Sequence, residues 1–186
     1  SNCNLVFDRD SSMVFSGQKV RFEDCIIYNE TSFESQVENL LSLENASAEF
    51  KNCEISFVAN ENGAAIKSSG SAVVCRDTGI TVQAGDGGCC IDSAVSVVRT
   101  DRCRLTVTSP SSCGVRVNNG QGIITGCTVY VSGNSGRGIE FINSKAAIQK
   151  CSITASLKDR TASSQAVYMD ENTSTLLNDD LDVKGF

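Results

Sequence analysis

The feature that most constrains this sequence is a short strand-like segment that returns along the whole chain. Each copy has apolar residues at alternate positions behind a cysteine or another small or polar residue. Alternation with a period of two indicates a half-buried β-strand. The copies are Cys3-x-Leu5-x-Phe7, Cys25-x-Ile27, Cys53-x-Ile55-x-Phe57, Thr78-x-Ile80-x-Val82, Cys103-x-Leu105-x-Val107, Cys127-x-Val129-x-Val131, Cys151-x-Ile153-x-Ala155 and Asp179-x-Leu181-x-Val183. Their starts recur at similar intervals, as the numbering shows, so the chain is built from one repeated unit.

A second strand alternates with the first. Its apolar anchors are Val14, Leu41, Ile66, Ile91, Val115, Ile139 and Val167. The centre of a first-type strand is its middle apolar residue, such as Ile55 or Ile80. The number of positions from an anchor to the next centre is the same from Leu41 to Ile55 and in every later repeat. Only the step from Val14 to Ile27 is one position shorter. The return step, from a centre to the next anchor, varies from repeat to repeat. We therefore expect one half of every repeat to have a fixed length and the other half to take up insertions.

Units of this size favour a β-solenoid, in which each coil stacks in register on the previous one at about 4.8 Å. The predicted fold is all-β, with about seven coils of 24–28 residues. Coils of this length, with two or three strands joined by unequal turns, resemble the right-handed parallel β-helix of the pectate-lyase-like superfamily. The resemblance covers nearly the whole chain and rests on the repeat, not on a catalytic motif.

The ends of the chain bear on its domain organisation. Residue 3 already lies in a predicted strand, and the chain stops just after Val183, so neither terminal coil has an obvious cap. Uncapped coils expose strand edges that pair with other chains. We expect residues 1–186 to be a single β-helix segment of a longer protein, with self-association through the ends as a further possibility.

Composition excludes several classes of function. A net charge of −6 argues against a nucleic-acid partner, whose phosphates require a basic surface. No apolar run approaches the ~18 residues of a membrane span. The chain has no His, which excludes Ser-His-Asp triads, Cys-His dyads and zinc held by imidazole.

Stacking would bring six of the ten cysteines into one column. These are Cys3, Cys25, Cys53, Cys103, Cys127 and Cys151. We interpret the column as a ladder of small buried side chains. The alternative is a metal site, but no Cys-x-x-Cys occurs and one ligand per coil is poor tetrahedral geometry, so we predict no metal and no cofactor.

A disulfide between coils stays open, although parallel side chains hold their Cβ atoms apart; we expect mostly free thiols, which favours a reducing compartment. Cys89 and Cys113 should form a further stacked pair.

Two outward columns are candidate binding surfaces. The first, on the first-type strands, contains Tyr28, Ser56, Thr81, Thr106, Tyr130, Thr154 and Asp182. Within it, the hydroxyl and aromatic groups of Tyr28, Thr81, Thr106, Tyr130 and Thr154 could bind a sugar by ring stacking and hydrogen bonding, or could simply reflect β-propensity on a solvent face.

The second outward column follows the second-strand anchors. It contains Ser42, Lys67, Asp92, Arg116, Glu140 and Tyr168. Four consecutive charges alternate in sign, which indicates ion pairs between coils; the alternative is a ligand groove. Next to it, small residues at positions 65, 90, 114, 138 and 166 indicate a close backbone approach at a bend. Two long returns, residues 29–37 and 155–165, should project from one corner and could supply specific contacts.

The family resemblance implies an enzymatic hypothesis. Members include lyases, glycoside hydrolases and esterases that act on polysaccharides. Of the hydrolase motifs Asn-Thr-Asp, Asp-Asp, Gly-His-Gly and Arg-Ile-Lys, only Asp179-Asp180 is matched here. Lyases of the family hold calcium with clustered Asp beside an Arg, but Asp77, Asp86 and Asp92 fall on different parts of one coil. No catalytic residue is assigned.

The sequence thus favours a non-catalytic solenoid over an enzyme. We expect a segment of a surface-exposed or virion protein, similar to adhesins and tail spikes, that binds a glycan or a host-surface protein through its lateral face and loops. Its expected location is extracellular, on a cell surface or in a virion, with a role in virulence. An intracellular β-helix scaffold for protein–protein interaction is the alternative that free cysteines fit best.

Overall fold

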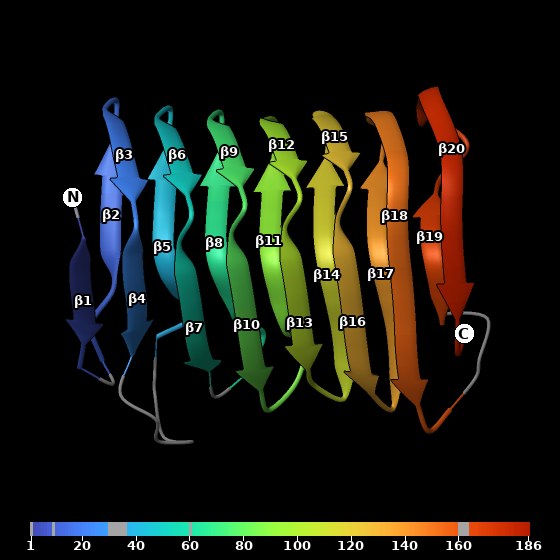
Figure 1. The fold of residues 1–186 in the computed structure, drawn as a ribbon, viewed down its shortest axis with the longest axis horizontal. Coiled ribbons are helices and arrows are strands. Elements are labelled where there is room, and N and C mark those ends of the chain that lie inside the picture. Colours follow the sequence, from blue (N-terminus) through green and yellow to red (C-terminus); the bar gives the residue numbers. More distant parts are fainter. Residues whose placement is uncertain (1, 9, 30–36, 60, 160–163) are drawn as a thin grey trace.

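The protein is a stack of parallel β-strands that advances along one axis (Figure 1). The computed structural model describes residues 2–8, 10–29, 37–59, 61–159 and 164–186. Within these ranges the chain is all-β, contains no helix, and forms a solenoid of about six turns. The predicted parallel β-solenoid is therefore confirmed, with a number of coils close to the expected seven.

Each coil contains three strands rather than two. The first strands are β1 (Cys3–Phe7), β4 (Cys25–Asn29), β7 (Glu54–Ala59), β10 (Gly79–Ala84), β13 (Arg104–Thr108) and β16 (Thr128–Gly133). The second strands are β2 (Met13–Ser16), β5 (Asn39–Glu44), β8 (Ala64–Ser69), β11 (Cys89–Ala94), β14 (Ser111–Asn118), β17 (Ser135–Ile142) and β19 (Gln165–Met169). The third strands are β3 (Lys19–Glu23), β6 (Ser47–Lys51), β9 (Ala72–Arg76), β12 (Val97–Asp101) and β15 (Gln121–Thr125). In the last coils a third and a first strand are continuous, as β18 (Lys145–Leu157) and β20 (Ser174–Lys184).

Equivalent residues of successive coils stack in register. Ile80 pairs with Ile55 on one side and Leu105 on the other, and Leu105 pairs with Val129. All four side chains are at most 1% exposed. They belong to a single apolar core that runs through the inside of the coils, as the column of alternating apolar residues predicts.

The fixed half of each repeat is explained by two corners, each made by one residue in the left-handed conformation. Between second and third strands the corner residues are Gly17, Asn45, Gly70, Val95, Asn119 and Asn143. Between third and first strands they are Asp24, Asn52, Asp77, Arg102, Gly126, Lys150 and Asp180. The corner N–H groups bond to carbonyls of the next coil; that of Gly70, for example, donates to Ala94 at 3.1 Å. An added residue would break this ladder, so in the coils that precede the last one insertions are confined to the third corner.

The first coil corrects one sequence assignment. Met13, not Val14, pairs with Leu41, and the Val14 side chain is 57% exposed. The step from Met13 to Ile27 equals the step from Leu41 to Ile55 in the following coil. The shorter step from Val14 to Ile27 is explained because Val14 is the more strongly apolar of two adjacent residues, whereas Met13 is the one that points inward.

The last coil corrects a second assignment. Cys151 pairs with Leu181 and Ile153 with Val183, so the copy at Asp179-x-Leu181-x-Val183 is displaced by one alternation from the true register. One extra residue lies in the turn before Ser174, and the register skips another between Thr175 and Leu177. The step from Val167 to the true centre, Val183, is therefore longer than in the other coils.

The small residues before the second-strand anchors do mark a close approach. A Cβ atom on Gly114 would lie 2.4 Å from the carbonyl oxygen of Gly138 and 2.5 Å from Cγ1 of Val129. On Gly138 it would lie 2.3 Å from Cγ2 of Ile153. At these two positions the adjacent coils leave no room for a side chain, whereas positions 65, 90 and 166 hold only small ones.

Val95 is the one β-branched residue among the corners, and it predicts a stability effect. Its φ angle is 53° and its side chain is 65% exposed, so the left-handed strain is not offset by burial. Left-handed backbone costs a non-glycine residue roughly 1–2 kcal/mol, and Asn tolerates it best. Val95→Asn, which matches Asn119 in the next coil, should raise the free energy of unfolding by about 1 kcal/mol in urea titration. Val97→Asn, in an ordinary strand conformation, is the control and should not stabilise; a Val95→Asn protein no more stable than the parent would contradict the corner assignment.

Candidate functional site

The outward face of the first strands carries the candidate ligand-binding residues in one line. Tyr28 pairs with Ser56, Ser56 with Thr81, and Thr81 with Thr106. Tyr130 and then Thr154 continue the line. Thr154 pairs with Lys184, not with Asp182. Asp182 was expected in this column, but it lies opposite Ser152, two residues earlier along the strand. All five candidate residues therefore share one face, and all are exposed or half-buried.

A block of hydroxyl groups surrounds Tyr130 on this face. Strands β13, β16 and β18 present nine outward positions there. In three rows these are Arg104, Thr106, Thr108; Thr128, Tyr130, Ser132; and Ser152, Thr154, Ser156. Eight of the nine carry a hydroxyl, and the Tyr130 side chain is 36% exposed at the centre. The arrangement offers one aromatic ring for stacking and hydrogen-bonding groups on every side.

Arg104, the one position of this block without a hydroxyl, carries a charge that an ion pair with Glu54 largely neutralises. Arg104 Nη2 lies 3.2 Å from Glu54 Oε1, two coils away. Gly79 occupies the position between them, and a Cβ atom there would lie 2.1 Å from Glu54 Oε2. The missing side chain thus lets Glu54 lie across the gap towards Arg104.

The second-strand face carries the predicted column of alternating charges. Lys67 Nζ lies 2.5 Å from Asp92 Oδ2, and Arg116 Nη1 lies 3.8 Å from the same oxygen. Arg116 Nε donates to Glu140 Oε2 at 2.7 Å. Each charge therefore pairs with the coil above or below, as expected from the sequence.

Arg137 belongs to this network of charges but was missed by sequence reasoning. Its Nη1 donates to Glu140 Oε1, and its guanidinium carbon lies 3.9 Å from the centre of the Tyr168 ring. The Glu140 side chain, held by two arginines, is only 5% exposed. Arg137 lies outside the column because it precedes Glu140 by three positions, on the early part of β17. The signal that could have found it is its register partner Cys113, near the start of the preceding second strand.

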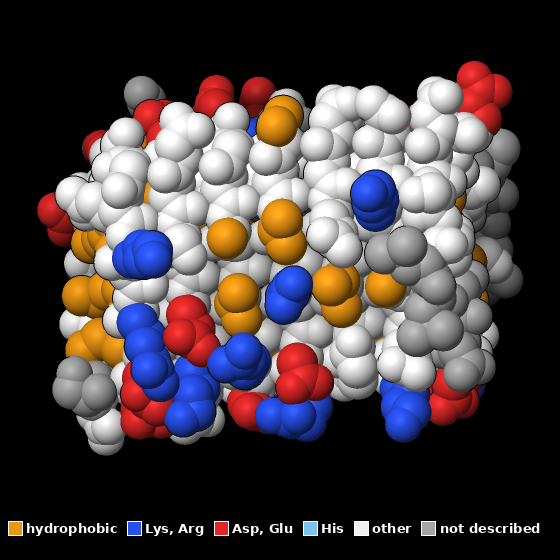
Figure 2. Space-filling model, turned by 90° about the horizontal axis from the view of Figure 1, so that it is seen from above, with side chains coloured by type: hydrophobic (Ala, Val, Ile, Leu, Met, Phe, Trp, Pro, Cys, Tyr) orange, Lys and Arg blue, Asp and Glu red, His pale blue; other side chains and the backbone are white. Residues whose placement is uncertain are grey.

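A third surface is apolar. On the outward side of the third strands, half-buried hydrophobic residues gather over β9, β12, β15 and β18. They are Ala72, Val74, Val97, Ile123 and Ala147. Figure 2 shows hydrophobic side chains in the middle of this face, beside a dense group of acidic and basic side chains. Val74, Arg99 and Ile123 line a shallow hollow of about 280 Å³.

The cysteine column has a structural role at the corner between third and first strands. Cys53, Cys103 and Cys151 each donate from the thiol to the carbonyl two residues earlier, at 3.3, 3.4 and 3.3 Å. Thr78 takes the same place with a hydroxyl, at 2.9 Å. Serines do so at the other corner; Ser71 Oγ donates to the Ser69 carbonyl at 2.8 Å. These small donors hold the carbonyls that precede each left-handed residue.

Three of the cysteines outside this column, Cys75, Cys90 and Cys113, are poor nucleophiles. Cys89 and Cys113 pair in register as predicted, and both are buried. A hydrogen bond with Cys89, together with burial, raises the pKa of the Cys113 thiol, and burial raises the pKa values of Cys75 and Cys90. A protonated thiol neither attacks carbonyls nor binds metal readily. Among the described residues no group of three or more His, Cys, Asp or Glu is placed to hold a metal ion.

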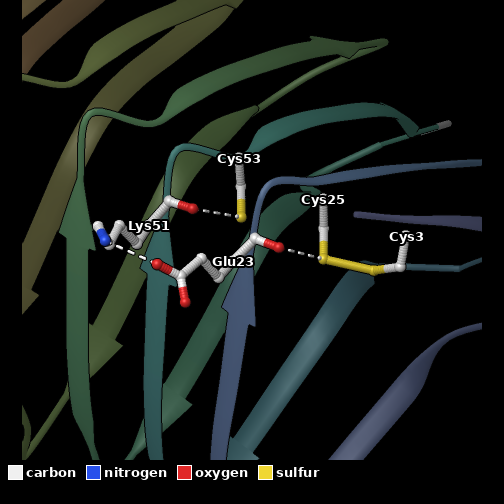
Figure 3. The surroundings of a disulfide bond; sticks show 5 residues. All are labelled: Cys3, Glu23, Cys25, Lys51 and Cys53. Carbon is white, nitrogen blue, oxygen red and sulfur yellow. Dashed lines mark hydrogen bonds and ion pairs between the residues drawn. A yellow bond between two sulfur atoms is a disulfide. The ribbon is translucent and has the colours of Figure 1, made fainter. Parts of the chain in front are cut away.

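Cys3 and Cys25 form a disulfide between the first two coils (Figure 3). Their Cα atoms lie 4.7 Å apart, and Cys25 Sγ lies 3.3 Å from the Glu23 carbonyl oxygen. The other eight cysteines are free and buried. Sequence reasoning left a disulfide between coils open, because the stacking distance allows one while parallel side chains hold their Cβ atoms apart.

The other sequence-based candidates do not converge. Asp77 binds Arg102 at a corner, Asp86 accepts a hydrogen bond from the Gly87 N–H in a turn, and Asp92 lies on the second-strand face. Residues 30–36 and 160–163 of the two long returns lie outside the described residues. No helix within the described ranges is long and apolar enough to cross a membrane.

Comparisons add no relative. The sequence matches no model of a protein family, no curated protein and no solved structure. The repeat and the three faces therefore carry the functional argument by themselves.

The buried Glu140 carboxylate predicts a large difference between two ion pairs. Glu140→Gln leaves Arg116 and Arg137 without their shared counter-charge in a partly buried site, and should cost about 1–3 kcal/mol of unfolding free energy. Glu54→Gln is the matched control: the side chains of Glu54 and Arg104 are 60% and 67% exposed, so its cost should stay within about 0.5 kcal/mol. Urea titration of both variants measures the difference. Equal costs would show that Glu140 does not hold the two arginines together.

Proposed function

We propose that the chain is a non-catalytic β-solenoid segment that binds a glycan through the face of its first strands. The observation that carries this proposal is the hydroxyl block around Tyr130. Sugar recognition commonly combines an exposed aromatic ring with several hydrogen-bonding groups, and a flat sheet presents both without rearrangement. The near neutrality of the block favours an uncharged glycan on this surface.

A protein partner is the second candidate, and the apolar surface of the third strands favours it. Hydrophobic residues over four adjacent strands, next to charged ones, are the usual composition of a protein interface. This candidate covers both a host-surface protein and the partner of an intracellular scaffold. Self-association through the terminal coils would use different surfaces, the strand edges of β1, β2 and β3.

An enzyme of the pectate-lyase-like type has less support. We infer a distant relationship to that superfamily from the coil length and the unequal turns alone. Among the described residues Glu140 has the most buried carboxylate, but both of its oxygens already accept hydrogen bonds from arginines, so neither is free to face a substrate. The acidic residues near Arg76 face different directions, so the described residues offer no pair in a common cleft.

The expected location is extracellular, on a cell surface or in a virion. The Cys3–Cys25 disulfide supports it, because disulfides persist mainly in oxidising surroundings. The eight free thiols do not oppose it, since burial protects them from oxidation.

Glycan binding is tested by removing the ring and one hydroxyl. Tyr130→Ala and Thr106→Ala should each weaken binding on a glycan array by about tenfold or more, because a stacked or hydrogen-bonded contact of about 1–2 kcal/mol is lost. Circular dichroism should show both variants folded, since the two side chains face solvent. Ile123→Ser, on the third-strand face, is the control and should bind as the parent does. Unchanged glycan binding by both Tyr130→Ala and Thr106→Ala would contradict the proposal.

The location is tested by counting reactive thiols. In protein isolated from its natural source, iodoacetamide should label none of the cysteines in the native state, because the free thiols are buried. In denaturant it should label eight, and after reduction all ten. Ten labelled cysteines in denaturant without reduction would contradict the disulfide and favour the intracellular alternative.

A further inference from the structure

A hollow on the second-strand face combines features that the glycan proposal does not use. It has a volume of about 330 Å³ and lies where β14 and β17 begin. Its polar lining comes from Arg116, Arg137 and Glu140, with the hydroxyls of Ser111, Ser112 and Ser135. The hollow therefore lies beside the third corner, on a different face from the Tyr130 block.

The charge within this lining does not cancel. Arg116 and Arg137 contribute two positive charges, and Glu140 contributes one negative charge. The next acidic residue, Asp92, already lies 2.5 Å from Lys67 and only 3.8 Å from Arg116. The hollow thus keeps about one excess positive charge on a chain whose net charge is −6. A local excess of this sign attracts a small anion.

The excess charge is carried by donors that have no other partner. Arg137 uses Nη1 for Glu140, and among the described residues no acceptor is found for its Nε and Nη2. Arg116 uses Nε for Glu140 and Nη1 for Asp92, which leaves Nη2. The two side chains are 28% and 37% exposed, whereas Glu140 is 5% exposed. An incoming anion would therefore meet guanidinium groups first, with the carboxylate behind them.

Both guanidinium groups are held in place before any ligand arrives. The Arg137 guanidinium lies over the Tyr168 ring, and its Nη1 donates to Glu140. The Arg116 guanidinium donates from Nε to the same carboxylate, which belongs to the neighbouring coil. A fixed planar guanidinium binds an oxyanion with little loss of side-chain entropy and offers two parallel N–H donors. Gly136 keeps the hollow open, since a Cβ atom there would lie 2.4 Å from Ser112 Oγ.

We propose that this hollow binds a single oxyanion group, a carboxylate, sulfate or phosphate, between Arg137 and Arg116. Glu140 positions the two arginines, and the hydroxyls of Ser111 and Ser135 donate further hydrogen bonds. The site is independent of the Tyr130 block, so loss of glycan binding on the first-strand face leaves it unaffected, and the reverse also holds.

The test follows the side-chain Nε–Hε signals of the arginines by ¹⁵N NMR. Sodium acetate, sulfate and inorganic phosphate are titrated separately at constant ionic strength, with chloride as the reference salt. The Arg137 and Arg116 signals should shift with saturation for at least one of the three anions, and the anion that saturates at the lowest concentration identifies the group. The Arg99 signal, from an exposed arginine on the third-strand face, should show only a weak linear shift.

Three variants separate binding from folding. Arg137→Gln should weaken the saturating response of Arg116 by tenfold or more, and Arg99→Gln should leave it unchanged. Because Arg137→Gln also removes a partner of Glu140, Ser111→Leu provides a second route: it obstructs the hollow from an exposed position, keeps every ion pair, and should likewise abolish the response. Linear shifts of all arginines, or an undiminished response in Ser111→Leu, would overturn the proposal.

Discussion

The structure depends on backbone corners that turn the chain without adding length. At two of the three corners of every coil before the last, a single residue takes positive φ, and in most of these coils its N–H bonds to a carbonyl of the next coil. This keeps the step from a second-strand anchor to the next first-strand centre constant over most of the chain and holds the strands in register. Register then turns sequence positions into columns, so one side-chain choice, repeated coil after coil, becomes a continuous core or a continuous surface.

The three outward faces show how differently such columns can be used. The first-strand face is rich in hydroxyls around Tyr130, the second-strand face carries the ion pairs that converge on Glu140, and the third-strand face is apolar around Ile123. Each face extends across several coils because a rung of about 4.8 Å lets equivalent side chains touch. A rigid rod can thus present separate surfaces to a sugar, an oxyanion and a protein.

The columns of the core and of the surface could be predicted from the sequence, because they follow from the period of the apolar residues. The positions of individual turns and of the first anchor could not, because they depend on how single residues pack. The column through Ile80 and Leu105, the charge column and the Tyr130 line were predictable, because register follows from the spacing of apolar residues. Met13 was missed in favour of Val14, since apolarity alone does not show which of two adjacent residues points inward. The third strands were missed because each corner has a single left-handed residue, which is too short to stand out as a turn in the sequence, and because residues such as Arg102 and Lys150 are not turn-forming types. The last coil was misaligned because its two extra residues lie in a turn and in an irregular part of the register, neither of which alters the apolar alternation nearby.

The most direct measurement of the central claim is a set of methyl–methyl nuclear Overhauser effects in the core. In-register stacking requires Ile80 to contact both Ile55 and Leu105, and Leu105 to contact Val129, although these residues are far apart in the chain. We predict strong cross-peaks for each of these three pairs and none between Ile55 and Val129, which lie three rungs apart. Cross-peaks from Ile80 to a different set of residues, with none to Leu105, would contradict the stacked coil and every surface derived from it.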